Sequence, residues 1–290
     1  MGKIKAVVWD ADNVWYKGIG TSHCAKKSKL DPQPYIDGFI KDGWFTYNDV
    51  KRWAEYRQKD TNNPIQTVGD LAQCLTDFLY ELKTPGSDKS IITKEQTIEG
   101  KQALLKGLTK KDIQSIAKDI EYTHGLLDSV STFRQSGMYQ TVFSDGLGPF
   151  IAYKAMELGI TDIGVVPIIV LTDDEERDFD GYNYTEISDF VLIGKVKPYN
   201  KAEDMFNRLS AYDKSEMATI DDSGNNVDSI LVPVRNAGGI AIGFNPTESH
   251  IQKFKEAGIP VLQQKERSLE PFKEIVLSDG DERIIAKYCV

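Results

Sequence analysis

Short runs of apolar and β-branched residues, each followed at once by polar residues, recur along the chain. Such runs cover residues 6–9, 140–143, 217–220 and 240–244, and two further ones cover 165–171 and 190–193. Runs of this length are typical of strands that are buried on both faces of a parallel sheet. We therefore expect a strand at each of these positions.

The segments between these runs predict helices. They cover residues 149–158, 200–209, 227–234 and 250–256, with Pro149 allowed in the opening turn of the first and Asn200 as N-cap of the second. The acidic segment 173–180 is expected at the tip of a hairpin. Strands that alternate with crossover helices of this length predict an α/β fold with a doubly wound parallel sheet.

Residues 17–122 interrupt the alternation and have a helical pattern. Apolar residues at 68, 71, 75, 78, 79 and 82 lie at helical spacing, and Thr93 followed by Gln96 forms a capping-box pattern. Thr109 is expected to cap another helix, and Asn48 to cap one that runs through Asp60. We predict a core domain of residues 1–16 and 123–290 and an inserted helical domain of residues 17–122.

Composition narrows the classes of partner. The chain has 290 residues, 40% of them hydrophobic and 27% charged, which suits one large or two modest globular domains. Its formal net charge of −9 argues against a nucleic-acid-binding surface, which needs a broad basic face. The longest apolar run, 165–171, contains a proline and is far shorter than the roughly 20 residues of a membrane helix. We expect neither nucleic acid nor a membrane as partner.

The amino terminus and the cysteines bear on the cellular compartment. Lys3 and Lys5 lead straight into the first predicted strand, which is unlike a signal peptide. Cys24, Cys74 and Cys289 have no metal-type spacing and cannot all pair. A cytoplasmic protein in a reducing environment is therefore expected. The oligomeric state stays open.

Polar side chains that could bind a ligand or take part in a reaction follow three of the predicted strands. These are Asp10 and Asp12 after the first, Ser144 and Asp145 after the second, and Asp221 and Asp222 after the third. Each group alone is also a plausible turn, because Asp, Asn, Ser and Gly favour turns. In a parallel sheet, however, the carboxyl ends of the strands share one edge, where ligands bind. Carboxylates gathered there repel one another unless a cation lies beside them.

Two lysines precede the third group. Lys197 stands before a proline, and Lys201 follows the predicted N-cap Asn200. A lysine is most often solvated on the surface. A lysine combined with three polar strand ends, in this order, makes a ligand site the stronger interpretation.

In these motifs the sequence resembles the haloacid dehalogenase superfamily, in its phosphatase branch. The first motif stands here as Asp10-Ala11-Asp12-Asn13-Val14, the second as Ser144, the third as Lys197 or Lys201, and the fourth as Asp221-Asp222-Ser223-Gly224. The helical insertion takes the position of the cap domain of that family. Among its members the chain looks most similar to those that are like phosphoserine phosphatase.

The resemblance implies a Mg²⁺-dependent phosphomonoesterase acting on a small phosphorylated metabolite. Asp10 would be the nucleophile that forms an aspartyl-phosphate, and Asp12 the general acid and base. Mg²⁺ would be held by Asp10, Asp222 and the main-chain carbonyl of Asp12, and Asp221 or Asp228 would supply the charge of a second acid that Asn226 replaces. Ser144, Asp145 and one of the two lysines would bind the phosphate.

Several points stay open under this resemblance. Lys197 and Lys201 are nearly equal candidates, with Lys197 slightly favoured because its distance to Asp222 along the chain resembles the family's Lys-Pro form. Lys101 stands where the family has an arginine that reads the substrate, and no glutamate shortly after Asp12 matches the one that holds the amine of phosphoserine. Phosphoserine is therefore not predicted as the substrate.

Three other functions compete with the phosphatase. A phosphotransferase or phosphomutase would use the same scaffold and differ only in the acceptor of the phosphoryl group. A catalytically inactive binding module is a further alternative. A dehalogenase is disfavoured, because that chemistry resembles members that lack the second acid, and Asp12 is present.

Overall fold

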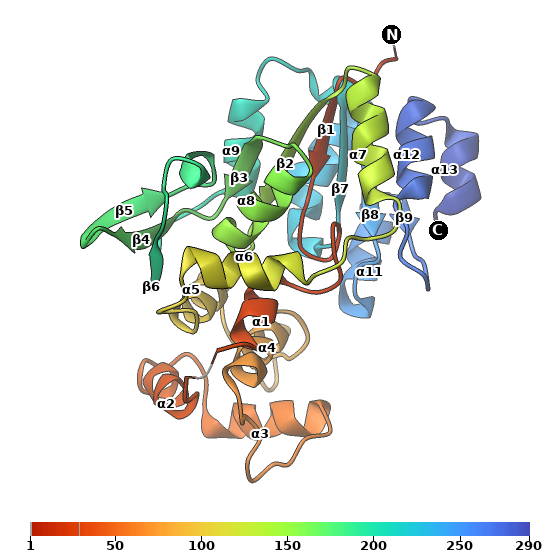
Figure 1. The fold of residues 1–290 in the computed structure, drawn as a ribbon. Helices are drawn as coiled ribbons and strands as arrows, with labels where there is room; N and C mark the ends of the chain where they lie inside the picture. The colour runs from red at the N-terminus through yellow and green to blue at the C-terminus, as the bar shows by residue number, and fades with distance from the viewer. Residues whose placement is uncertain (1, 29) are drawn as a thin grey trace.

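The central layer of the protein is a six-stranded sheet in which every neighbouring pair of strands is parallel (Figure 1). The computed structural model describes residues 2–28 and 30–290. In spatial order the strands are β3 (Asp162–Val165), β2 (Tyr139–Ser144), β1 (Ala6–Trp9), β7 (Met217–Asp221), β8 (Ile240–Phe244) and β9 (Val261–Leu262). The predicted parallel sheet is confirmed.

Alternate residues of β1 face opposite layers of helices. Val7 and Trp9 belong to the main hydrophobic core, where the Trp9 ring lies 5.9 Å from the Phe133 ring and 5.3 Å from the Phe272 ring. Ala6 and Val8 face a second cluster on the other side of the sheet. Both faces of the strand are thus covered, as its continuous apolar run requires.

The helices of the core lie on both faces of this sheet (Figure 1). They are α7 (Leu126–Gln135), α8 (Gly148–Glu157), α9 (Lys201–Arg208), α10 (Val232–Asn236), α11 (Glu248–Glu256), α12 (Glu270–Leu277) and α13 (Glu282–Tyr288). The helix predicted over 227–234 is a π-helical turn, Val227–Leu231, that continues into α10. Helices α7, α12 and α13 were not predicted.

The described residues of 17–122 form six helices, in agreement with the helical pattern of this stretch. They are α1 (Gly20–Ala25), α2 (Gln33–Lys41), α3 (Tyr47–Tyr56), α4 (Val68–Tyr80), α5 (Lys94–Ala103) and α6 (Lys110–Lys118). The predicted caps Thr93 and Thr109 are confirmed, since each side chain accepts a backbone N–H three residues on. The predicted helix from Asn48 to Asp60 was wrong at both ends, because the Thr46–Asp49 capping box starts α3 earlier and Tyr56 ends it.

The strand predicted over 165–171 was wrong, because two strands in two different sheets share this segment. Strand β3 ends at Val165, and β4 (Ile168–Thr172) starts a separate antiparallel sheet with β5 (Glu175–Phe179) and β6 (Val191–Val196). Pro167 lies between them, and its carbonyl accepts the amide of Lys197. The hairpin tip predicted in the acidic segment is confirmed at Asp173 and Asp174, which both have positive φ.

The helical insertion, residues 17–122, leaves and re-enters the core through two segments that lie side by side. Tyr16 and Tyr122 form an antiparallel bridge, and the amide of Thr123 donates to the carbonyl of Trp15 at 2.7 Å. A third attachment comes from β6, where Leu192 exchanges two backbone hydrogen bonds with Gly107 and Leu108. The division into two domains at residues 16 and 123 stays a prediction.

None of the described helices combines the length and the apolar character that a membrane crossing needs. Cys24, Cys74 and Cys289 are all free.

Candidate active site

The order of the strands brings three of the predicted polar groups to one edge of the sheet. Strand β1 lies between β2 and β7, so Asp10, Ser144 and Asp221 are at neighbouring carboxyl ends. Trp9 pairs with Ile220, which makes Asp10 and Asp221 the next residues along the two strands. All three polar side chains are buried.

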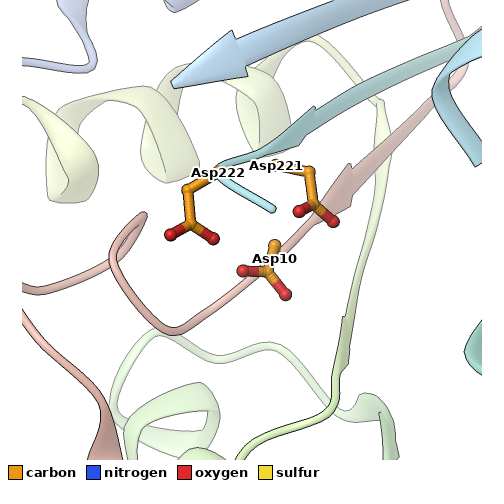
Figure 2. Close-up of side chains that lie close together, drawn as sticks. All are labelled: Asp10, Asp221 and Asp222. Atoms are coloured by element: carbon orange, nitrogen blue, oxygen red, sulfur yellow. The ribbon is translucent and has the colours of Figure 1, made fainter. Parts of the chain in front are cut away.

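Three carboxylates form a compact cluster at this edge. Asp10, Asp221 and Asp222 each offer an oxygen, and these oxygens lie within 4.8 Å of one another. Figure 2 shows the three side chains turned toward a shared space, Asp10 from the end of β1 and the other two from the end of β7. Such an all-oxygen donor set is what Mg²⁺ and Ca²⁺ prefer in proteins.

The charges of the cluster are mutually unfavourable without a cation. Burial and, after it, the neighbouring charge of Asp221 raise the pKa of Asp222 to about 7. Burial also raises the pKa of Asp10 well above its ordinary range, while the ammonium of Lys201 opposes that shift. A divalent cation beside these oxygens would stabilise the ionised forms, so the residues present fit a metal.

Lys201 already neutralises part of this charge. Its Nζ donates to Asp10 Oδ1 at 2.7 Å and to Asp221 Oδ2 at 2.9 Å, and its side chain is 4% exposed. Burial lowers the pKa of Lys201, but the charges of Asp10 and Asp221 raise it well above its ordinary value, and the lysine stays charged. Its position is set locally, because Asn200 caps α9 and Lys201 is the first residue of that helix.

Lys197 lies elsewhere. Its ammonium forms an exposed ion pair with Asp178 on β5. The slight preference for Lys197 is therefore contradicted by the geometry. The chain leaves β6 with the Lys197 amide bonded to Pro167, and the side chain follows the antiparallel sheet rather than the edge of the parallel one.

Asn226 and Asp228 were the other residues considered near the fourth motif. Asn226 Nδ2 donates to Asp221 Oδ2 at 2.9 Å and so supports the cluster without adding charge. Asp228 is exposed, pairs with Lys253 and is not in the cluster. Of the two acids proposed to replace a second aspartate, Asp221 is the one at the site.

Asp12 lies beside the carboxylate cluster but is not one of its members. Its Oδ1 accepts two hydrogen bonds, one from the Tyr16 hydroxyl at 2.5 Å and one from the Gly20 amide at 2.8 Å. Burial raises the pKa of Asp12, and both hydrogen bonds oppose this shift. Sequence reasoning missed Tyr16, because a tyrosine in a turn carries no signal until the turn brings it back onto Asp12.

The loop after β2 lies opposite Asp12. The buried Ser144 Oγ accepts the amide of Gly146 at 3.2 Å. A Cβ on Gly146 would lie only 2.4 Å from Asp12 Oδ2, so this oxygen faces the loop closely. The Asp145 carboxylate pairs with Lys94 of α5 at 2.7 Å.

A cavity of about 350 Å³ lies between the sheet edge and the helical insertion. Asp10, Asp12, Ser144 and Asp222 line it from the core, and Thr76, Asp77, Tyr80, Thr97 and Lys101 are among the residues that line it from the insertion. Lys101 is 8% exposed, and no described residue forms an ion pair or hydrogen bond with its ammonium. Burial lowers the pKa of Lys101 to about 8.

No protein-family model matches the chain, and no curated protein matches its sequence. Its structure is similar to solved structures of phosphoserine phosphatase. A phospho-aspartyl intermediate analogue of that enzyme is 14% identical, with 95% of this chain and 98% of the other covered and a TM-score of 0.58. A substrate-bound complex is also 14% identical, with 96% and 99% covered and a TM-score of 0.59.

A HAD family hydrolase from Salmonella enterica serovar Typhi is 13% identical over 96% of this chain and 73% of its own, with a TM-score of 0.54. The chain has the fold of the haloacid dehalogenase superfamily. The match to the phosphoserine phosphatase structures spans nearly the whole of each chain, so the haloacid dehalogenase fold here includes the helical insertion as well as the sheet. Identities this low establish the fold, and the function has to be argued from the site.

Proposed function

We propose that this protein is a Mg²⁺-dependent phosphomonoesterase that hydrolyses a small phosphorylated metabolite through an aspartyl-phosphate. One observation carries the proposal: Asp10 lies at the edge of the sheet with an ammonium and two further carboxylates beside it, and Asp12 shares its cavity. This is the arrangement that a carboxylate nucleophile with a separate proton donor requires.

In the first step an oxygen of Asp10 attacks phosphorus. A P–O bond to Asp10 forms, the P–O bond to the leaving group breaks, and Asp12 gives its proton to the leaving oxygen. In the second step Asp12 takes a proton from water as the water oxygen attacks phosphorus. The bond to Asp10 breaks, inorganic phosphate is released, and both carboxylates return to their starting states.

The residues around Asp10 bind the transferred group. The Lys201 ammonium and the Ser144 hydroxyl are the donors at the edge for phosphoryl oxygens. Asp145 would contribute through its main chain, because its side chain pairs with Lys94. Mg²⁺ held by Asp10, Asp221 and Asp222 would supply the positive charge that lets a phosphate dianion approach a carboxylate.

The helical insertion selects the substrate. Its wall of the cavity contains hydroxyl groups and the unpaired ammonium of Lys101. A substrate whose leaving group carries a second anionic group would pair with that ammonium. The insertion also excludes bulk water from the reacting groups, which strengthens their electrostatic interactions. A cytoplasmic location stays a prediction.

Turnover of a panel of phosphorylated metabolites with Mg²⁺, followed by release of free phosphate, tests the proposal. Asp10→Asn should lower turnover by about 10⁴-fold or more, because the amide is not a nucleophile, while thermal unfolding shows a folded protein. Asp228→Asn is the matched control, since this exposed acid lies outside the site and its loss should leave the rate unchanged.

Two results would contradict the proposal. Normal turnover in Asp10→Asn would remove the nucleophile from the mechanism. A wild-type protein that releases no phosphate from any ester, p-nitrophenyl phosphate included, would favour an inactive binding module. Consumption of the ester without free phosphate would instead identify a transferase.

A further inference from the structure

Tyr16 is a buried residue at the site that the mechanism above does not use. Its side chain is 0% exposed, and its hydroxyl makes one hydrogen bond among the described residues, to Asp12 Oδ1 at 2.5 Å. The Gly20 amide donates to the same oxygen at 2.8 Å. Asp12 Oδ1 thus has two donors, whereas no described residue donates to Oδ2.

The hydroxyl of Tyr16 is held in place by its surroundings. The backbone of Tyr16 pairs with Tyr122 where the chain enters and leaves the insertion, and its ring packs edge-on against Phe150 at 5.3 Å. Gly20 permits this approach, since a Cβ there would lie 2.9 Å from the Phe150 ring and 3.3 Å from the Tyr16 hydroxyl. The donor therefore has a fixed direction that does not depend on a mobile side chain.

We propose that Tyr16 is a positioning residue that locks the Asp12 carboxylate, so that Oδ2 is the oxygen that gives and takes the proton in both chemical steps. The inference rests on the proposed function, and it names the reacting oxygen of Asp12 and the residue that positions it. Oδ1 is occupied by its two donors, and Oδ2 lies against the Ser144–Gly146 loop, on the side of the phosphate site. Without the hydroxyl, one amide remains, and the carboxylate is free to turn about its own bonds.

The two steps need Asp12 to different extents, which gives a sharp test. p-Nitrophenolate leaves without a proton, whereas an alkoxide does not, and water must be deprotonated whichever ester is used. Tyr16→Phe should therefore keep the first turnover of p-nitrophenyl phosphate within about threefold of the wild type and slow its steady-state turnover by about tenfold or more. Stopped-flow absorbance should show a stoichiometric burst of p-nitrophenolate.

An alkyl phosphomonoester should behave differently in the same variant. Its first turnover should fall by about tenfold or more, because the leaving oxygen needs the proton of Asp12. For the alkyl ester KM should stay within about twofold, because both steps slow and Tyr16 does not line the cavity that holds the substrate. For p-nitrophenyl phosphate KM should fall together with kcat, because kcat/KM depends on the first step, which is unchanged. In an Asp12→Asn background, Tyr16→Phe should cause no further loss.

Tyr122→Phe is the matched control. It removes a hydroxyl from the bridge partner of Tyr16, where the group donates to Lys154 O and Glu157 Oε2 and does not contact Asp12. This variant should keep wild-type kinetics on both esters. Thermal unfolding of both variants checks that the fold is intact.

The outcomes separate the two proposals. Equal slowing of the first and later turnovers of p-nitrophenyl phosphate, a rise in KM alone, or unchanged kinetics on the alkyl ester would overturn the role of Tyr16. In each of those cases the wild type still hydrolyses phosphate esters and the proposed function stands. A wild type without activity would overturn the proposed function and the role of Tyr16 together.

Discussion

The two walls of the cavity are built differently, although both are buried. On the sheet edge, two of the three clustered carboxylates have a partner: Lys201 bonds Asp10 and Asp221, and Asn226 supports Asp221. On the insertion, the hydroxyls of Thr76 and Thr97 donate to carbonyls of their own helices, and the ammonium of Lys101 has no described partner. The ammonium of the sheet-edge wall is therefore paired before any substrate binds, whereas the ammonium of Lys101 on the insertion has no described partner.

This difference assigns the chemical steps to the sheet edge and the choice of substrate to the insertion. A site whose groups are already held in place needs little reorganisation when the phosphoryl group moves. An unpaired buried cation destabilises the folded protein, since burial disfavours the charged form. That cost is recovered when an anionic ligand binds. Substitutions on the sheet edge should therefore affect every substrate, and substitutions on the insertion only some.

The largest effect is expected for Lys201→Met. The change leaves the buried carboxylates of Asp10 and Asp221 without their ammonium partner, which should lower turnover of all esters by about 10²-fold or more. It should also destabilise the fold by about 3 to 5 kcal/mol, as loss of one partner of a buried ion pair does. Urea unfolding, with and without Mg²⁺, measures this, and the cation should restore part of the loss.

Lys197→Met serves as the control for that experiment. Lys197 forms an exposed ion pair with Asp178, which contributes about 0 to 1 kcal/mol. Equal effects of the two substitutions on stability and turnover would remove the distinction between the two lysines.

A smaller effect is expected in the pH dependence of stability. The pKa of Lys101 in the folded protein is lowered by burial to about 8, from its ordinary value of 10.5. Between these two pH values the folded protein binds fewer protons than the unfolded chain, so the free energy of unfolding rises with pH. Below this window the penalty of the buried charge is complete, and above it the penalty is gone.

The size of the rise is about 3 kcal/mol for a shift of this magnitude. Urea unfolding at pH 7 and pH 10.5 measures it as the difference between the wild type and Lys101→Met. That difference isolates the lysine from the buried tyrosines and cysteines, whose side chains ionise in the unfolded chain over part of the same range. If the free energy of unfolding changed equally with pH in the two proteins, the Lys101 ammonium would lie in water or in an ion pair.

The smallest effect is expected for the substrate preference of Lys101→Met. For an ester with a second anionic group, loss of the ammonium should raise KM by about tenfold, which corresponds to one charge-assisted hydrogen bond. The KM of p-nitrophenyl phosphate, whose leaving group lacks that second anion, should change by less than about twofold. Lys106→Met is the control, since Lys106 is exposed near the same helix. An equal rise in KM for both esters would show that Lys101 binds the phosphate itself.

The positions of Asp10, Ser144 and Asp221 at one edge could be predicted because they depend only on where strands end. A buried parallel strand has a clear sequence pattern, and the carboxyl ends of all strands in a parallel sheet lie at the same edge. The caps at Thr93 and Thr109 were predictable for a similar reason, since a capping box is contained within four residues. Local signals therefore carried much of the framework of the site.

The missed features depend on tertiary contacts. The choice between Lys197 and Lys201 depended on the direction in which the chain leaves β6, which residue spacing does not encode. The run at 165–171 was assigned to one strand because hydrophobicity does not show that Pro167 divides two sheets. Helix α1 lacks a side-chain cap and packs against α4, so no local sequence pattern predicts it.

Gly146 has one more consequence for how mutational data on this site are interpreted. Its backbone does not require a glycine by its dihedral angles, yet a single added methyl group would lie 2.4 Å from an oxygen of Asp12. An inactive alanine variant at this position would thus report a displaced neighbour rather than a missing function. In an alanine scan of the whole chain, substitution of Gly146 would lower activity as much as substitution of a catalytic residue, although Gly146 takes no part in the reaction.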